Sequence, residues 1–438
     1  MFGIASLFGL RRTPGIRGLF AAIDVGSSTI TCMLCHANGH AEVQVVGIGT
    51  QRAEGFSKGN VTDAAAAQQS ILSAINQAEE IAGETAERVV VSTNAGYPRS
   101  RLLELELEVD GNLINQSHID SLNHYSRQPL DDEQDAGFPV RRLNTMLIEY
   151  SVDGRDGVQD PRGMSAQLLK AKYLVVTAQK SALQSVIDCV ERCHLSVHQI
   201  MANPLASAYG ALSVEERQHG STMIDFGAQC TSIAVFSSGR PVHLEMLPTG
   251  SDLLTNDLAA ALGCGLSDAE RIKCLHGAAF LRPTDGSIEL EVPSVDPLEA
   301  PASVNRAYLV DVIQARLDEL FERIATRLDH PKLLPFSSKR VVLTGGGSGL
   351  VGIKDYVALR LSRATRIGRP APLEGISHMQ LIPAQSSVIG TARFAVEANL
   401  SPDNLPPPTA GENSDSFLAS ARQLLNFSND PTTNGRSA

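Results

Sequence analysis

Three short, mostly apolar runs near the start of the chain predict strands over Leu19–Val25, Thr31–Cys35 and Val43–Ile48. Asp63 then begins a predicted helix that continues to about Ala82, because apolar residues recur there with helical spacing. The apolar stripe of this helix consists of Ile71, Leu72, Ile75, Ala78 and Ile81. Strands that alternate with helices in this way are typical of a layered α/β domain.

The same order of elements returns in the second half of the chain. A predicted strand ends in Ile224-Asp225-Phe226-Gly227, two further strands follow, and a helix is predicted over Asp252–Leu262. The first half has Ile23-Asp24-Val25-Gly26 at the corresponding position. A duplicated domain is therefore predicted. Residues 95–169 between the repeats read as shorter, more polar strands and predict a small inserted α+β domain.

Composition narrows the possible functions. The chain has 438 residues, 43% of them hydrophobic and 19% charged, with a net charge of −11. Single cores stop growing at about 250–300 residues, so we expect two or more domains. We expect no nucleic-acid partner, because an acidic, sparsely charged chain lacks the cationic face that such binding requires. The seven cysteines are scattered without zinc-ligand spacing, which favours a reducing cytoplasm over a disulfide framework.

Both Asp-x-Gly turns have residues suited to binding the phosphates of a nucleotide. Glycine permits a tight turn and leaves backbone N–H groups free to point at an anion. An aspartate beside them is suited to hold a hydrated Mg²⁺ that bridges the phosphates. Either turn alone is as readily an ordinary hairpin turn. Two of them at repeated positions favour a phosphate site between two lobes, with Asp24 and Asp225 reaching Mg²⁺ through water.

A third glycine cluster, Gly345-Gly346-Gly347, follows a predicted strand over Val341–Thr344 and precedes a predicted helix over Leu350–Leu361. Gly347–Gly352 satisfies the dinucleotide pattern G-x-G-x-x-G. That pattern expects an acidic residue about 20 positions further on, and Thr365–Arg369 contains none. We therefore interpret the cluster as a loop on which adenine packs.

These motifs resemble the actin-like ATPase superfamily, which includes the sugar kinases, and within it the FtsA family of bacterial cell-division proteins. The superfamily motifs are Ile23–Ser28, Asn203–Tyr209 and Leu343–Gly347. The stretches more specific to FtsA are Gly55–Asp63, Asp160–Met164, Ser267–Gly277 and Val292–Val295. The resemblance covers about Leu19 to Asn399, with the stretches in the family's order.

The resemblance implies a duplicated, two-lobed, actin-like α/β fold with ATP and Mg²⁺ between the lobes. It implies that Glu270 and Lys273 contact ribose and adenine, although from the residues alone they are as readily an ordinary surface ion pair three positions apart. It assigns polymer contacts to residues 95–169 and binding of the C-terminal tail of the tubulin-like protein FtsZ to residues 263–305. It further implies self-association into filaments, recruitment of other divisome membrane proteins, and work at the septum on the cytoplasmic face of the inner membrane.

The expected domains and site residues can be given in full. We expect an N-terminal tail over 1–18, a first core subdomain over 19–94 and 170–205, the inserted domain over 95–169, a second core subdomain over 206–262 and 306–400, an upper subdomain over 263–305, a linker over 401–414, an amphipathic helix over 415–427 and a tail over 428–438. The expected nucleotide-binding residues are Asp24, Gly26, Ser27, Ser28, Asp225, Gly227, Gln229, Glu270, Lys273, Gly345, Gly346 and Gly347.

The second Asp-x-Gly turn departs from the family's usual Asp-x-Gly-Gly-Gly-Thr, because Ala228-Gln229-Cys230 follow Gly227. The added Cβ atoms restrict positive φ angles and close backbone approach. Gln229 is open to two interpretations, one in which it orients water or phosphate and one in which it is a solvent-facing turn residue. We expect ATP binding to persist and hydrolysis to be slow or absent. Asp225 is the candidate for positioning Mg²⁺ or water, and we assign no catalytic base.

Both ends of the chain have features suited to a membrane surface. The apolar stripe of the predicted C-terminal helix consists of Phe417, Leu418, Ala421, Leu424 and Leu425. Few cations accompany it, so its binding would rest on apolar burial. The N-terminus offers Phe2 and Phe8 followed by Arg11 and Arg12, an order opposite to that of a secretory signal. No apolar run reaches the about 20 residues that cross a bilayer.

The sequence therefore predicts an ATP-binding, actin-like cell-division scaffold that tethers FtsZ filaments to the membrane. One alternative is an actin-fold phosphotransferase or efficient ATPase, which would need a catalytic aspartate beside a substrate pocket. Asp110, Asp120 and Asp131 of the inserted segment stand in no such motif. A second alternative is an ATPase of pilus assembly like PilM, which shares the fold and the inserted domain; the Ser267–Gly277 stretch and the predicted C-terminal helix argue against it.

Overall fold

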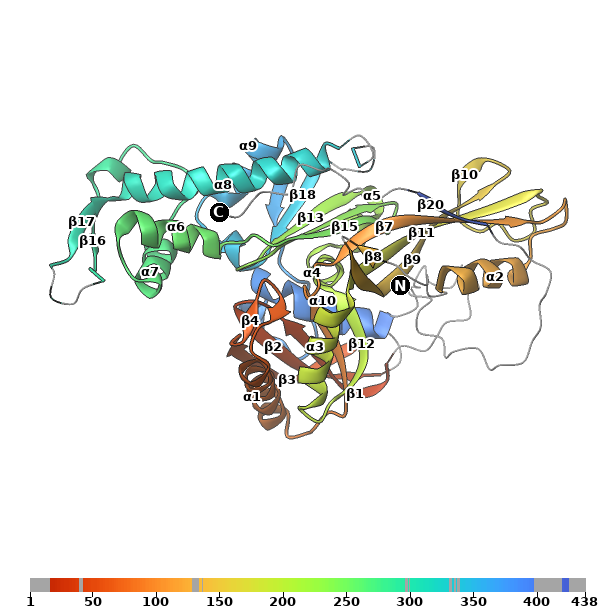
Figure 1. Cartoon of the computed structure of the whole chain (residues 1–438), viewed down its shortest axis with the longest axis horizontal. Coiled ribbons are helices and arrows are strands. Elements are labelled where there is room, and N and C mark those ends of the chain that lie inside the picture. The colour runs from red at the N-terminus through yellow and green to blue at the C-terminus, as the bar shows by residue number, and fades with distance from the viewer. Residues whose placement is uncertain are drawn as a thin grey trace.

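The structure is a computed structural model that describes residues 16–38, 42–127, 134–135, 137–295, 298, 300–330, 333–334, 336, 339–397 and 420–424. Two sheets organise it, one of five strands and one of eleven (Figure 1). We call the five-stranded sheet and its helices lobe I, and the β15-β14-β13-β18-β19 part of the larger sheet with its helices lobe II. The duplicated, two-lobed α/β organisation expected from the sequence is present.

Lobe I is built on strands in the order β12-β6-β1-β2-β3. Successive residues of β1 point to opposite faces of the sheet, as the strand period requires. Ala21 and Ile23 pack in the core that includes α1, whereas Phe20 and Ala22 pack in the core that includes α10. The bounds are β1 Gly18–Val25, β2 Thr29–Ala37, β3 Val43–Arg52, β4 Phe56–Ser57, β5 Asn60–Val61, α1 Ala64–Ala82, β6 Arg88–Thr93, α3 Lys180–Glu191, β12 Ser196–Ala202, α4 Asn203–Ala211 and α10 Ser386–Glu397.

The inserted domain extends the larger sheet away from lobe II (Figure 1). Its β7 meets β15 of lobe II at the Arg99–Glu245 pair. Its bounds are β7 Arg99–Glu108, α2 Gln116–Arg127, β8 Gln134–Asp135, β9 Phe138–Val152, β10 Arg155–Val158 and β11 Leu168–Gln179.

One expected domain boundary is wrong. Residues 170–205 are expected in the first core subdomain, but β11 pairs with β7 and β9 of the inserted domain throughout its length. The hydrophobic pattern predicts that Lys172–Thr177 is a strand, yet it carries no information on which sheet supplies the hydrogen-bonding partner. The return to lobe I therefore begins at α3.

Lobe II repeats the strand–turn–strand plan of lobe I. Ile224 and Phe226 of β13 pack in the core formed with α6, α7, α8 and α9, whereas Met223 packs on the opposite side, in the core that contains α4. The bounds are α5 Val214–His219, β13 Ser221–Phe226, β14 Thr231–Ser237, β15 Arg240–Leu247, α6 Asp252–Leu262, α7 Leu266–His276, β16 Glu289–Val292, β17 Ala302–Asn305, α8 Arg306–Leu328, β18 Arg340–Thr344, α9 Ile353–Leu361 and β19 Ala364–Ile367. Helix α7 and the β16–β17 hairpin lie within residues 263–305, the expected upper subdomain.

Helices α4 and α10 cross at very short range where the two lobes join. A Cβ atom added to Gly210 would lie 1.9 Å from the carbonyl oxygen of Ser386, and one added to Gly390 would lie 1.8 Å from that of Ala206. Real Cβ atoms do not approach so closely, so both positions require glycine. The crossing fixes the N-termini of both helices between the strands that carry the two Asp-x-Gly turns.

The prediction of an amphipathic helix over 415–427 is wrong for the central part of that segment. Ser420–Leu424 form a strand, β20, that pairs antiparallel with Leu102–Glu106 of β7. A short isolated helix is marginal in water, whereas the open edge of β7 offers a row of backbone partners to any extended segment. Of the expected membrane contacts, Ala421 and Leu424 lie in β20, and Phe2, Phe8, Arg11, Arg12, Phe417, Leu418 and Leu425 lie outside the described residues. No helix in the described part of the chain is long and apolar enough to span a membrane.

Candidate functional site

The two Asp-x-Gly turns have the same geometry in both lobes. Asp24 lies near the end of β1 and Asp225 near the end of β13. A Cβ on Gly26 would lie 2.6 Å from the carbonyl oxygen of Thr29, and a Cβ on Gly227 would lie 2.8 Å from that of Cys230. Each turn therefore needs its glycine because the chain folds back onto itself within three residues.

A chain of hydrogen bonds, buried except where it reaches Asp24, links the two aspartates across the lobes. Asn203, at the start of α4, donates to Asp24 Oδ1 at 3.2 Å and to Ser387 Oγ at 2.9 Å. Ser207 and Ser387 both donate to Asp225 Oδ2. Asn203, Ser207 and Ser387 are all buried. The α4–α10 crossing thus places neutral donors between two carboxylates that belong to different lobes.

The electrostatics of this pair favour a bound cation. Burial raises the pKa of Asp24 to about 7, the charge of Asp225 adds to the rise, and hydrogen bonds from Ser92 and Asn203 only partly oppose it. Burial likewise raises the pKa of Asp225. Neither carboxylate forms an ion pair with a Lys or Arg among the described residues. A positive ion between the lobes would therefore stabilise the ionised form of both.

The third glycine cluster packs directly on the second turn. Gly345 has a φ of 84°, and a Cβ there would lie 2.2 Å from Asp225 Oδ1. A Cβ on Gly347 would lie 2.4 Å from the ring of Phe226, whereas Gly346 has open space around its Cβ position. The strands β13 and β18 are parallel neighbours, so their carboxyl ends bring these glycines and Asp225 together.

Glu270 and Lys273 form a pair on α7 that is anchored to α6. Lys273 Nζ lies 2.6 Å from Glu270 Oε2 and donates to Thr255 Oγ1 at 2.8 Å. Thr255 in turn donates to Glu270. Burial opposes ionisation of Glu270, but hydrogen bonds from Lys273 and Thr255 outweigh it and lower its pKa. Lys273 is buried whereas Glu270 is exposed, so the pair lies at the boundary between the interior and the surface. The segment that follows α7 contacts the loop after the third glycine cluster, where Ala279 N donates to the carbonyl oxygen of Val351 at 2.8 Å.

The structure brings the two Asp turns and the third glycine cluster into one site, with contacts between the lobes that involve Ser27, Gln229 and Cys230. Ser27 Oγ lies 4.0 Å from Cys230 Sγ, and Gln229 Oε1 accepts the backbone N–H of Lys58 at 2.7 Å. Gln229 is thus not simply a solvent-facing residue. We made no site assignment for Asn203, Ser207, Ser387 and Ser92. The Asn-Pro start of α4 was a signal for Asn203, but nothing local marks the two serines as partners of distant aspartates.

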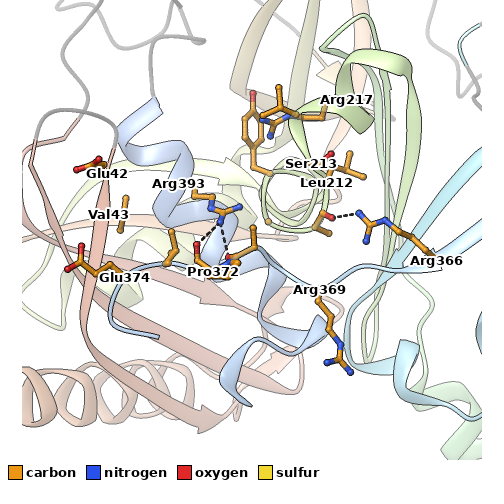
Figure 2. Close-up of a pocket in the computed structure, with 16 residues that line it drawn as sticks. Glu42, Val43, Leu212, Ser213, Arg217, Arg366, Arg369, Pro372, Glu374 and Arg393 are labelled. Atoms are coloured by element: carbon orange, nitrogen blue, oxygen red, sulfur yellow. Dashed lines mark hydrogen bonds between the residues drawn. The ribbon is translucent and has the colours of Figure 1, made fainter. Parts of the chain in front are cut away.

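A cavity of about 660 Å³ lies away from this site, at the joint between the lobes (Figure 2). None of the expected nucleotide-binding residues lines it. Arg393 of α10 donates to the carbonyl oxygens of Ala371 and Pro372, Arg366 donates to that of Ala211, and the guanidinium of Arg217 lies 4.6 Å from the ring centroid of Tyr209. Arg393 thus joins α10 to residues 371–372, and Arg366 and Arg217 both contact α4.

Comparison with known proteins identifies the family. A model of the family "Cell division protein FtsA" matches residues 21–210 and 222–390. The chain belongs to the FtsA family. The cell division protein FtsA of Agrobacterium fabrum is 32% identical over 413 residues, which cover 90% of this chain and 92% of that protein. The expected family assignment is thereby confirmed, and cell division is the process in which this chain takes part.

Solved structures with low sequence identity confirm the actin-like fold. A PilM–PilN type IV pilus biogenesis complex has a TM-score of 0.61 at 16% identity and covers 87% of this chain and 99% of its own. MreB5 of Spiroplasma citri bound to ADP has a TM-score of 0.53 at 12% identity and covers 87% of this chain and 97% of its own. These similarities concern the fold alone.

Proposed function

We propose that this FtsA-family protein is an ATP-binding scaffold of cell division that self-associates, binds the C-terminal tail of FtsZ and attaches it to the cytoplasmic face of the inner membrane at the septum, where it helps to recruit other divisome proteins. ATP and Mg²⁺ occupy the space between the two Asp-x-Gly turns. Binding, and not rapid turnover, is the task of this site.

The observation that carries the nucleotide assignment is the pair of carboxylates, half-buried Asp24 and buried Asp225, linked across the lobes. Carboxylate oxygens are ligands that Mg²⁺ prefers, and Mg²⁺ usually keeps several waters and shares the phosphates of its nucleotide. The described residues contain no group of three or more His, Cys, Asp or Glu side chains that could hold a metal alone. Two carboxylates that contact the ion through water fit these facts, and the ion would supply charge neutralisation to the phosphates.

Calorimetry with ATP and Mg²⁺ tests this assignment. We expect micromolar affinity for the wild type and at least tenfold weaker binding for Asp24→Asn, Asp225→Asn and Lys273→Ala. Asp355→Asn, an exposed substitution on α9, is the matched control and should bind like the wild type. Absence of ATP binding to the folded wild type would remove the nucleotide from the proposal, and equal binding by all variants would place it elsewhere.

The upper subdomain has the exposed apolar side chains that binding of a peptide tail requires. Large apolar residues exposed there are Leu266, Leu275, Leu281, Ile288, Val295 and Leu298. Fluorescence anisotropy with a labelled FtsZ C-terminal peptide should give saturable binding that Leu275→Ser and Leu298→Ser weaken about tenfold. Met379→Ser replaces an equally exposed apolar residue outside the subdomain and serves as the control. Equal loss in all three variants would exclude a specific role for residues 263–305.

Membrane attachment is assigned to the two ends of the chain; at the C-terminal end it cannot rest on a helix over 415–427, because Ser420–Leu424 form β20. Co-sedimentation with vesicles that contain anionic lipid should fall when residues 1–15 are removed and again when residues 401–438 are removed. Because arginines supply the N-terminal attraction, only that contribution should weaken with salt. Complete loss of binding on removal of 401–438 alone would exclude the N-terminus.

Self-association is tested by light scattering on the full chain with ATP and Mg²⁺.

A further inference from the structure

A tight hairpin in lobe I presents two backbone N–H groups that need partners outside the turn. Strands β4 and β5 pair Phe56 with Val61 and Ser57 with Asn60, so only Lys58 and Gly59 form the turn. Their φ angles are 48° and 81°, as in the two-residue turns that match the twist of a hairpin. In such a turn the N–H groups of both central residues take no part in the hairpin's own hydrogen bonds.

Both N–H groups are used by side chains of the two Asp-x-Gly turns. Gly59 N donates to Ser27 Oγ at 3.1 Å, within lobe I. Lys58 N donates to Gln229 Oε1 at 2.7 Å, and this bond joins lobe I to lobe II. The hairpin tip therefore contacts both turns, and the amide of Gln229 carries the contact between the lobes.

The rest of the hairpin is held firmly on lobe I. Gly96 N donates to Asn60 Oδ1 at 2.9 Å, and a Cβ on Gly59 would lie 2.8 Å from the backbone carbon of Asn94. Because the tip cannot move independently of lobe I, separation of the lobes must break the Lys58–Gln229 bond. A glycine at position 229 would have no side chain with which to form it.

We propose that Gln229 holds the two lobes together around the nucleotide site, so that it sets how fast nucleotide enters and leaves and does not itself bind the phosphates. Gln229 stands where the family pattern of the second Asp-x-Gly turn has a glycine. A glycine there would let the backbone approach the phosphates closely, whereas Gln229 forms an interlobe hydrogen bond. The interlobe bond itself does not depend on the proposed function, and only its effect on nucleotide exchange rests on that function.

Hydrogen exchange on the nucleotide-free full chain tests the bond directly. The Lys58 amide should be protected in the wild type and should exchange about fivefold faster in Gln229→Met, which keeps the length of the side chain and removes the acceptor. Gln229→Glu keeps an acceptor and should retain the protection. Gln69→Met, an exposed change on α1, is the control. Equal exchange of the Lys58 amide in the wild type and Gln229→Met would overturn the proposal.

Stopped-flow measurement with a fluorescent adenine nucleotide and Mg²⁺ tests the consequence. If the bond restrains opening, its loss should raise the rates of entry and release alike, each about fivefold, with little change in Kd. A residue that touches the phosphates would instead change release and Kd and leave entry unaltered, and that result would overturn the proposal. If the wild type binds no nucleotide, the proposed function fails, while the exchange measurement still decides whether Gln229 joins the lobes.

Discussion

Replacement of Asp24 by Asn should stabilise the nucleotide-free protein, and the gain should grow with pH. In the folded protein burial raises the pKa of Asp24 from 3.8 to about 7, and Asp225 contributes to the shift. Between these two values the folded state holds a proton that the unfolded state has released. Unfolding therefore releases a proton, and the free energy of unfolding falls as pH rises through this window.

The magnitude follows from the shift itself. Each pKa unit corresponds to 1.36 kcal/mol, so ionised Asp24 costs the folded state about 4 kcal/mol at pH 8. At pH 5 most of that cost is absent, and the difference between the two pH values is about 3 kcal/mol. Asn resembles the protonated carboxyl in size and neutrality and removes the cost at both pH values.

Urea denaturation of the full chain without nucleotide measures the effect. The gain from Asp24→Asn over the wild type should be about 3 kcal/mol larger at pH 8 than at pH 5, whereas Asp355→Asn should show no such trend. Groups that titrate equally in both proteins cancel in the comparison. A gain that is the same at both pH values, or a loss that deepens with pH, would refute the raised pKa of Asp24 in the folded protein.

Further expectations concern the lobe joint, the upper subdomain and turnover. Gly390→Ala should cost roughly 3 kcal/mol despite alanine's helix propensity, because its Cβ would collide with the carbonyl oxygen of Ala206, while Gly286→Ala, with open space, should be neutral in the same urea experiment. Asp285→Asn should lower the Tm at pH 7, since the backbone N–H of Arg282 and the side chain of Arg306 lower the pKa of Asp285; the deficit should shrink below pH 4 as the wild-type carboxyl takes up its proton. Phosphate release should stay below about 1 s⁻¹, the lower end of ordinary enzyme turnover, and faster release would show that the altered second turn supports hydrolysis. Binding of ATP with Mg²⁺ near pH 6.5 should release protons as the cation lowers the pKa of Asp24, which calorimetry in buffers of different ionisation enthalpy detects; no buffer dependence would contradict it.

Local features that the sequence predicted rest on interactions between near neighbours in the chain. Asp63 caps α1 because its carboxylate accepts the N–H groups of Ala65 and Ala66, and Gly83 ends the helix with a φ of 69°. The Asp-x-Gly turns could be found in the same way, since each glycine is needed for a fold-back within a few residues. A duplicated α/β fold and the FtsA family follow from such motifs in the right order.

Contacts between distant segments were decided only by the tertiary structure. A strand pattern does not say which sheet will receive it, so β11 joins the inserted domain, and Ser420–Leu424 take the open edge of β7 in place of a helix. Ser387 meets Asp225, and Gln229 meets Lys58, because the α4–α10 crossing and the facing turns bring residues from different lobes within hydrogen-bonding distance. The sequence by itself determined the elements and the chemistry of each turn, since these depend on neighbours in the chain. Packing of the two lobes determined how the turns are connected, since that depends on partners more than a hundred residues away.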